Sequence, residues 1–278
     1  MRLQPIDDPE DPRIEAYRSL KEADLVLRRG LFVAEGVLVV ERLLRATRFR
    51  ARSLLLTEPR LQGLEEAIEA SGQDPLVHVV SRSVMDQIVG FPIHRGCLAL
   101  GERAAPQEAR ALLAAARTVV VLLGLSNHDN VGSIFRSALA LGAEAILIDR
   151  ETADPLYRKA IRVSMGTVLD LPFVSMERPA ILEALRQAGF ARWALTPAAD
   201  AAVLTPGQAS PERLALLLGA EGEGLSPEAQ AAADLRVRVP MVPGVDSLNA
   251  AVAGAVVLGM LGRMRAPPAG PPSGPKYT

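Results

Sequence analysis

An asparagine and an arginine stand where an apolar, strand-like run gives way to a helical pattern. Asn130 is predicted to cap this helix, because its side chain can accept hydrogen bonds from the free N–H groups of the first turn. Arg136 follows on the same helix, off the apolar stripe that faces the core. Its guanidinium can fork onto a phosphate or stabilise developing negative charge. Taken alone, each residue also has a purely structural explanation: Asn130 as a helix cap and Arg136 as a solvated surface charge.

Glycines and carboxylates dominate a second polar segment, residues 219–228. Gly219, Gly222 and Gly224 permit backbone conformations and close approaches to a ligand that other residues disfavour. Glu221 and Glu223 make the segment a poor phosphate cradle, because such cradles use lysine and neutral donors. The segment therefore suits a ligand with cationic or hydroxyl groups better than a nucleoside triphosphate. A flexible acidic turn is the alternative.

A third segment joins a strand at 235–239 to a long apolar helix at 248–263. Its prolines and Gly244 stiffen a loop that ends on Ser247, which is the expected N-cap, with Asn249 in the first turn. The helix is apolar all round, which indicates burial in the core or in a subunit interface. The polar residues that open such a helix need hydrogen-bond partners, either backbone groups or a bound ligand.

These three segments are expected at one edge of a parallel sheet. From residue 118 on, apolar strands are predicted at 119–123, 145–148, 191–195, 214–218 and 235–239, and helices at 131–141, 179–188 and 248–263. Strands that are apolar throughout are typical of a parallel sheet with helices on both faces. Ligands of such sheets collect beyond the carboxyl ends of the strands, where the three segments lie.

The first part of the chain carries a smaller α/β pattern. Strands are predicted at 31–34, 53–57, 76–80 and 97–100, and helices at 36–44 and 61–70. We therefore expect a small domain at 1–103, a linker with a short helix at 104–117 and a second domain at 118–265. The last stretch, 266–278, is rich in proline and glycine and is expected to be disordered.

Composition limits the classes of protein that fit. The 278 residues have a formal net charge of −1, which argues against coating nucleic acid through bulk positive charge but leaves room for a local patch. A single cysteine, Cys97, excludes an internal disulfide framework. We expect a cytoplasmic protein, since the amino terminus is polar and the longest apolar stretch is too short for a membrane span. No metal-ligand cluster is expected.

The three segments together resemble the three motifs of the SpoU (TrmH-like) family of RNA 2′-O-ribose methyltransferases. The match consists of Asn130 with Arg136, the run 218–225, and Val239 with Ser247 and Asn249, in the same order and spacing. Residues 159–166 also resemble a stretch between the first and second motifs. Segments 32–36 and 94–99 resemble the ribosomal-protein-like RNA-binding domain that precedes many catalytic domains of this family. Three ordered motifs are far more specific than any one of them.

The resemblance implies a SPOUT fold, in which a parallel-sheet catalytic domain ends in a carboxyl-terminal trefoil knot. It also implies a homodimer that binds S-adenosylmethionine and RNA, with no metal. The implied cofactor-binding residues are Leu195, Thr196, Gly219, Glu221, Gly222, Val239, Met241, Ser247 and Leu248. The implied catalytic residues are Asn130, Arg136, Glu221, Ser247 and Asn249. The family assigns the base to the arginine that matches Arg136, but a guanidinium keeps its proton in proteins, so a phosphate contact is an equal alternative.

The function expected from these observations is transfer of a methyl group to a ribose 2′-hydroxyl of structured RNA, with rRNA favoured over tRNA. Two alternatives are an RNA-binding ribosome-assembly or resistance factor without methyl transfer, and a dinucleotide-dependent oxidoreductase. The oxidoreductase lacks support because no G-x-G-x-x-G follows the first strand of the second domain. A basic strip is expected to select the RNA. Its arginines are Arg42, Arg45, Arg48, Arg50 and Arg52. A solvated arginine-rich face is the alternative.

Overall fold

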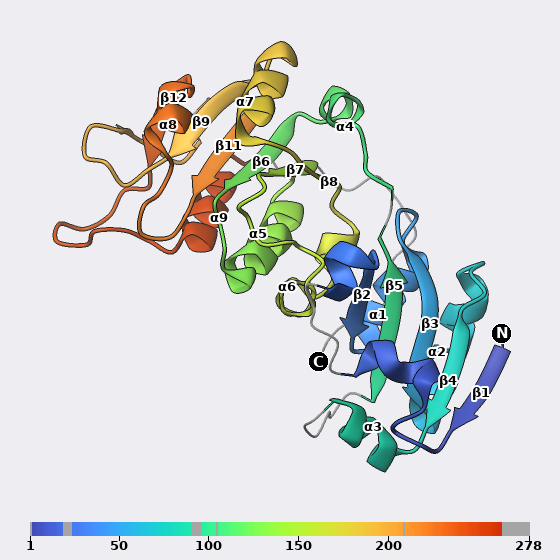
Figure 1. The fold of residues 1–278 in the computed structure, drawn as a ribbon. Helices are drawn as coiled ribbons and strands as arrows, with labels where there is room; N and C mark the ends of the chain where they lie inside the picture. Colours follow the sequence, from blue (N-terminus) through green and yellow to red (C-terminus); the bar gives the residue numbers. More distant parts are fainter. Residues whose placement is uncertain (1, 19–23, 90–95, 104, 208, 263–278) are drawn as a thin grey trace.

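Two β-sheets organise the chain in a computed structural model (Figure 1). It describes residues 2–18, 24–89, 96–103, 105–207 and 209–262. The predicted tail at 266–278 and the end of the helix predicted to reach Arg263 lie outside the described residues. Within the described part of the chain, no helix is long and apolar enough to cross a bilayer.

The first sheet has five strands in the order β1-β4-β3-β5-β2. Its strands are β1 (Arg2–Ile6), β2 (Leu31–Glu35), β3 (Arg50–Thr57), β4 (Leu76–Val80) and β5 (Cys97–Glu102). The strands β1, β4 and β3 run parallel, whereas β5 pairs antiparallel with both β3 and β2. The accompanying helices are α1 (Val37–Arg45), α2 (Glu58–Ala70) and α3 (Arg82–Val89), with short helical turns at Pro12–Tyr17 and Asp24–Arg28.

The second sheet has seven strands in the order β10-β12-β9-β11-β6-β7-β8, and every pair is parallel. Its strands are β6 (Thr118–Leu123), β7 (Ala145–Ile148), β8 (Phe173–Ser175), β9 (Ala191–Leu195), β10 (Ala202–Val203), β11 (Leu214–Gly219) and β12 (Leu235–Arg238). Its helices are α4 (Ala109–Ala115), α5 (His128–Ala140), α6 (Arg158–Val163), α7 (Arg178–Gln187), α8 (Pro227–Ala231) and α9 (Ala250–Met260), with a 3-10 turn at Thr167–Leu169. The prediction of a parallel α/β sheet is confirmed.

Helices cover both faces of the second sheet, as its uniformly apolar strands require. On one face, Val120 and Leu218 pack with α5 and α9. On the other face, Val121 and Leu217 pack with α4, α7 and α8. The alternation follows from the two-residue period of a strand, which sends successive side chains to opposite faces.

The core on the α5 and α9 face continues into the first sheet. Phe32 and Leu43, from β2 and α1, belong to the same cluster of buried residues as Phe173 of β8 in the second sheet. Three ion pairs cross the same junction: Arg42 with Asp170, Arg103 with Asp154, and Arg158 with Glu35. The two sheets therefore join through one apolar core and three ion pairs. Figure 1 shows α6 next to the first sheet, where it contacts β2.

Two helix caps differ from the sequence prediction. Asn127, not Asn130, caps α5 and accepts from the backbone N–H of Asp129 at 2.8 Å. Asn249, not Ser247, caps α9. In both cases the helix begins at a different residue than expected, because a nearby second polar side chain offers the same capping chemistry. The sequence analysis also missed short elements: β1, β8, β10, α3 and α6.

The five arginines of the predicted basic strip do not form one surface. Arg42 pairs with Asp170, and the Arg48 guanidinium lies 5.5 Å from the centre of the Phe173 ring. These two side chains serve the junction between the sheets, while Arg45, Arg50 and Arg52 are exposed. The prediction is wrong for Arg42 and Arg48, because acidic and aromatic partners from the second sheet's side of the junction draw them inward.

Gly101 provides a sharp test of packing in the first sheet. A Cβ added there would lie 2.3 Å from the ring of Phe32, which is fully buried. Gly101→Ala should therefore lower the free energy of unfolding by about 1–3 kcal/mol through overpacking. Gly63→Ala is the matched control, since Gly63 lies in α2 with open space around its Cβ position, and this change should be neutral or stabilising. Denaturant unfolding of both variants measures the effect, and an unchanged Gly101→Ala variant contradicts the packing.

Candidate functional site

The carboxyl ends of four neighbouring strands of the second sheet meet at one edge. β11 pairs in register with β6, so that Gly219 lies opposite Leu123, and it also pairs with β9. β12 then pairs with β9, placing Val237 opposite Leu195. The chain therefore leaves β9, β11 and β12 at the same side of the sheet. This is the position where open parallel sheets bind ligands.

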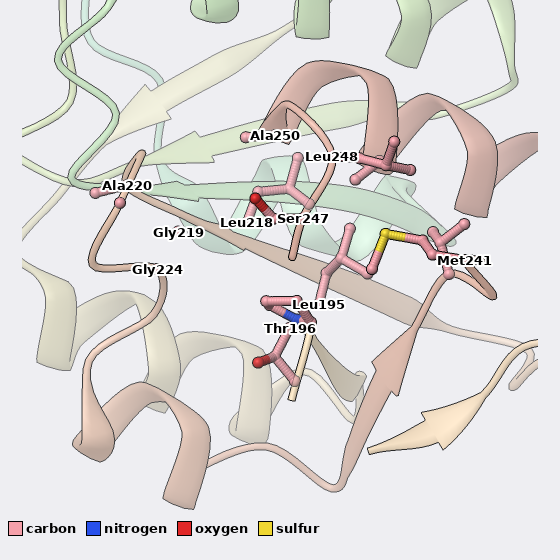
Figure 2. Close-up of a pocket in the computed structure, with 14 residues that line it drawn as sticks. Leu195, Thr196, Leu218, Gly219, Ala220, Gly224, Met241, Ser247, Leu248 and Ala250 are labelled. Atoms are coloured by element: carbon pink, nitrogen blue, oxygen red, sulfur yellow. The ribbon is translucent and has the colours of Figure 1, made fainter. Parts of the chain in front are cut away.

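A pocket of about 150 Å³ lies at this edge and is partly open to solvent. It is lined by Leu195, Thr196, Pro197, Leu218, Gly219, Ala220, Gly222, Gly224, Val239, Met241, Ser247, Leu248, Ala250 and Ala253. Figure 2 shows Leu195 and Thr196 on one side and Ser247 and Ala250 on the other, with Met241 towards one end. Every residue predicted to contact the cofactor lines this pocket except Glu221.

The 219–224 segment closes on itself as a tight loop. Ala220 and Gly224 exchange backbone hydrogen bonds of 3.2 and 3.0 Å. A Cβ on Gly219 would lie 2.2 Å from the carbonyl carbon of Gly224, so only glycine fits there. Gly222 and Gly224 have φ angles of 82° and 71°, in the left-handed region that glycine favours. The glycines are thus needed for the conformation of the loop itself, and the loop forms one wall of the pocket.

A direct hydrogen bond joins the first and third predicted motifs. Asn249 donates from Nδ2 to Oδ1 of Asn130 at 2.8 Å. The Oδ1 atom of Asn249 accepts from the backbone N–H groups of Ala251 and Val252, at 3.0 and 3.2 Å. Asn130 is buried, and its Nδ2 has no hydrogen-bond partner among the described residues. The Asn249 amide thus fixes the start of α9 against α5, whereas the Asn130 amide keeps an unused donor, Nδ2.

The remaining predicted catalytic residues lie at the surface. Arg136 is exposed on α5, and within the described residues its guanidinium makes no ion pair or hydrogen bond. Glu221 is exposed in the 219–224 loop, outside the pocket lining. The structure therefore brings Asn130 and Asn249 together and places Ser247 in the pocket, while the side chains of Arg136 and Glu221 are open to solvent.

The pocket lining also includes residues that the sequence did not single out as cofactor contacts. Leu218, Ala220 and Gly224 belong to the predicted motif 218–225, whereas Pro197, Ala250 and Ala253 lie outside the predicted contacts. Small and apolar side chains of this kind carry no chemical signal, so only their position after a strand, or in the first turns of α9, could have indicated them. In the described part of the chain, no group of three or more histidine, cysteine or acidic side chains could hold a metal ion.

Comparison with known proteins assigns the family. The SpoU rRNA Methylase family matches residues 117–259. An uncharacterised tRNA/rRNA methyltransferase of Mycobacterium bovis is 42% identical over 261 residues, covering 91% of this chain and 90% of that protein. A 23S rRNA (adenosine(1067)-2′-O)-methyltransferase of Streptomyces azureus is 32% identical over 197 residues, covering 69% and 72%.

A solved structure agrees with these relatives. An AdoMet-bound rRNA methyltransferase from Sinorhizobium meliloti superimposes with a TM-score of 0.79 at 25% identity, covering 93% of this chain and 97% of that chain. The agreement therefore extends over both sheets and is not limited to the 117–259 match. Two of the three motifs line one pocket, the first motif is joined to them through Asn130 and Asn249, and relatives match nearly the whole length of the chain. The chain therefore belongs to the SpoU rRNA methylase family and is a methyltransferase of this TrmH-like type.

Proposed function

We propose that the protein transfers a methyl group from S-adenosylmethionine to a ribose 2′-hydroxyl of structured RNA, with rRNA favoured over tRNA. The observation that carries the proposal is the pocket at the carboxyl ends of β9, β11 and β12, with the Asn130–Asn249 pair beside it. The Streptomyces azureus relative named as a 2′-O-methyltransferase supports the ribose hydroxyl as acceptor. The AdoMet-bound Sinorhizobium meliloti structure supports the methyl donor.

The pocket suits S-adenosylmethionine in shape and charge. Leu195, Leu218 and Val239 offer apolar surface for an adenine ring, and the hydroxyls of Thr196 and Ser247 offer polar contacts. Among the described residues, the lining contains no lysine or arginine, which disfavours a nucleotide phosphate. Two carboxylates in the neighbouring loop, Glu221 and Glu223, give this side of the pocket a negative potential that a sulfonium cation favours.

When bound, S-adenosylmethionine supplies an electrophilic methyl group, so the chain's task is to orient the ribose hydroxyl, whose proton passes to water as the bond to the methyl group forms. Arg136 is exposed and free to contact RNA. Because its guanidinium keeps its proton, we assign it to the phosphate beside the target ribose and to the negative charge that develops on the oxygen. Asn130 is buried, so in this proposal it acts by holding Asn249 and the start of α9 in place.

Two architectural features belong to the same proposal. The end of the chain from β11 through α9 forms the trefoil knot implied by the family resemblance, and the proposed domains are 1–103, 118–265 and the linker at 104–117 between them. The 1–103 domain selects the RNA, with the exposed Arg45, Arg50 and Arg52 as its basic contacts.

The protein acts as a homodimer in this proposal. Four large apolar side chains gather on the third motif and α9. They are Val242, Val245, Leu248 and Val252, exposed by 70%, 46%, 38% and 50%. Such a patch on a protein surface marks an interaction site.

Cofactor binding is tested at Gly219. Calorimetry should show that the wild-type protein binds S-adenosylhomocysteine and not NADH. Gly219→Ala should weaken this binding about tenfold or more, because its Cβ must displace the Gly224 backbone and with it one pocket wall. Gly259→Ala, on α9 with open space around the Cβ position, is the matched control and should bind normally. A wild-type protein that binds no cofactor but binds RNA would instead support the assembly-factor alternative.

Arg136 is tested by methyl transfer to rRNA purified from a strain that lacks the gene. Arg136→Ala should reduce single-turnover transfer about a hundredfold or more, the usual effect of losing one charge-stabilising donor. Its stability should change by no more than about 0.5 kcal/mol, because the side chain is exposed. Lysine at this position should restore part of the rate if a point charge suffices, but not if a forked phosphate contact is needed. Arg110→Ala, on the surface of α4, is the control; full activity of Arg136→Ala refutes the assignment.

Dimerisation is tested at Val252. The wild-type protein should sediment as a dimer, and Val252→Asp should shift it towards monomer, because a buried unpaired carboxylate opposes association. Leu3→Asp is the control, since Leu3 is 50% exposed on β1, the edge strand of the first sheet. A wild-type protein that sediments as a monomer while transferring methyl groups excludes the dimer as the active form.

A further inference from the structure

A buried carboxylate holds the loop that leads from β6 to the proposed catalytic helix. Asp149 follows β7 directly, and its side chain is only 2% exposed. Its Oδ1 atom accepts from the backbone N–H groups of Gly124 and Thr152, at 3.0 and 2.9 Å, and from the Thr152 hydroxyl at 2.7 Å. Gly124 and Asp149 belong to loops after two neighbouring strands, so these bonds tie one loop to the other.

The same contacts continue for one more residue along the first loop. The N–H of Leu125 donates to the Thr152 hydroxyl at 3.3 Å, and the carbonyl of Leu125 accepts from the N–H of Ala153 at 2.9 Å. Asn127 then caps α5, which carries Asn130 and Arg136. The start of α5 is therefore placed by the loop after β7, through Gly124 and Leu125, which lie three and two residues before the cap.

An arginine from a third element completes this cluster. Arg178, the first residue of α7, donates from Nε and Nη2 to Oδ2 of Asp149, at 3.1 and 2.8 Å, and from Nη2 to Glu151 at 2.6 Å. The Nη2 atom also lies 3.7 Å from the point where a Cβ of Gly124 would stand, and the Cβ of Ala220 lies 3.6 Å from that point. The guanidinium thus sits at the junction of the loops after β6, β7 and β11.

We propose that Arg178 is a positioning residue for methyl transfer: through Asp149 it fixes the loop that begins α5 against the pocket wall at Ala220. This inference rests on the proposed function, because it concerns how Asn130 and Arg136 are aligned with the pocket. Arg178 is absent from the pocket lining, so it acts through other residues rather than on the substrate. Nothing in the three motifs indicates it, since it lies outside all of them.

The chemistry of the pair explains why an arginine is needed. Burial alone raises the pKa of Asp149, but the hydrogen bonds from Gly124, Thr152 and Arg178 outweigh this effect and hold the pKa below its usual value. A carboxylate kept ionised in this way remains an acceptor for the Gly124 N–H. Without Arg178, the buried charge loses two donors and its only cation among the described residues, so the loop is expected to shift or loosen. Misplacement by about 1 Å can lower a rate by about a hundredfold.

The test compares Arg178→Gln with Arg186→Gln. Arg186 lies on the same helix and makes an ion pair with Glu183. This pair is exposed and involves neither Asp149 nor Glu151, the two partners of Arg178. For Arg178→Gln we expect kcat to fall about tenfold or more with the KM for RNA changed less than about threefold, while Arg186→Gln matches the wild type. Arg178→Lys keeps one donor and the charge, and should recover part of kcat.

A second measurement does not depend on activity. Hydrogen exchange should accelerate in the peptide that covers residues 124–130 of Arg178→Gln and stay unchanged in Arg186→Gln. If Arg178→Gln fails to fold, Arg178→Lys carries both measurements. Wild-type kcat in Arg178→Gln, or slow exchange at 124–130 in a folded variant, overturns the inference. Absence of any methyl transfer by the wild-type protein would refute the proposed function instead, and the exchange result would then still decide whether Arg178 holds the loop.

Discussion

The parallel pairing of β11 with β6 is the constraint on which the rest of the site depends. Leu218 lies opposite Leu122 and Gly219 opposite Leu123, so two strands nearly a hundred residues apart end at the same level. Since parallel strands all point the same way, the loops that follow them must leave from one edge. A shift of this register by one residue would turn the apolar side chains of β11 to the opposite faces. It would also move the 219–224 loop away from Gly124.

Close backbone approach, rather than large side chains, builds the structure around the pocket. A Cβ on Gly254 of α9 would lie 2.9 Å from the Leu218 side chain. A Cβ on Gly132 of α5 would lie 2.6 Å from the carbonyl oxygen of Ala160. These glycines let α9 pack closely against β11, and α5 against α6. Because the interior is close-packed, a methyl group at Gly132 has no space unless a helix moves, and one at Gly254 requires the Leu218 side chain to shift. Gly254 thus faces the sheet, while Val252 on another side of the same helix is exposed.

Much of this site was accessible from the sequence, because strand ends, glycine clusters and polar helix starts leave a local pattern. The segments after β11 and β12 were predicted from such patterns, whereas Leu195 and Thr196 at the end of β9 followed only from the family resemblance; all of them line one pocket. The helix caps were misassigned, because Asn127 and Asn130, like Ser247 and Asn249, have the same capping ability, and only the path of the chain selects between them. The contact of Arg178 with Asp149 was inaccessible, since nothing local links a residue of α7 to the loop after β7.

The junction between the sheets was also beyond sequence reasoning, for a different reason. Arg42, Arg48 and Glu35 look like surface charges in a sequence, and each finds its partner more than a hundred residues away. The side chain of Glu35 is only 7% exposed, and a buried carboxylate needs a charged partner, which Arg158 provides. Helical periodicity predicts which residues of a helix are buried, but it does not predict which distant element of the chain they pack against.

This junction also connects the first sheet to the pocket. α6 pairs with the first sheet through Arg158 and Glu35, and it supports α5 where Gly132 meets Ala160. α5 in turn is joined to the start of α9 through Asn130 and Asn249. The first sheet is therefore linked to the helix that carries Arg136 through a series of packed elements. If the first domain holds the RNA as proposed, this packing sets the distance between the RNA contact and the reacting ribose.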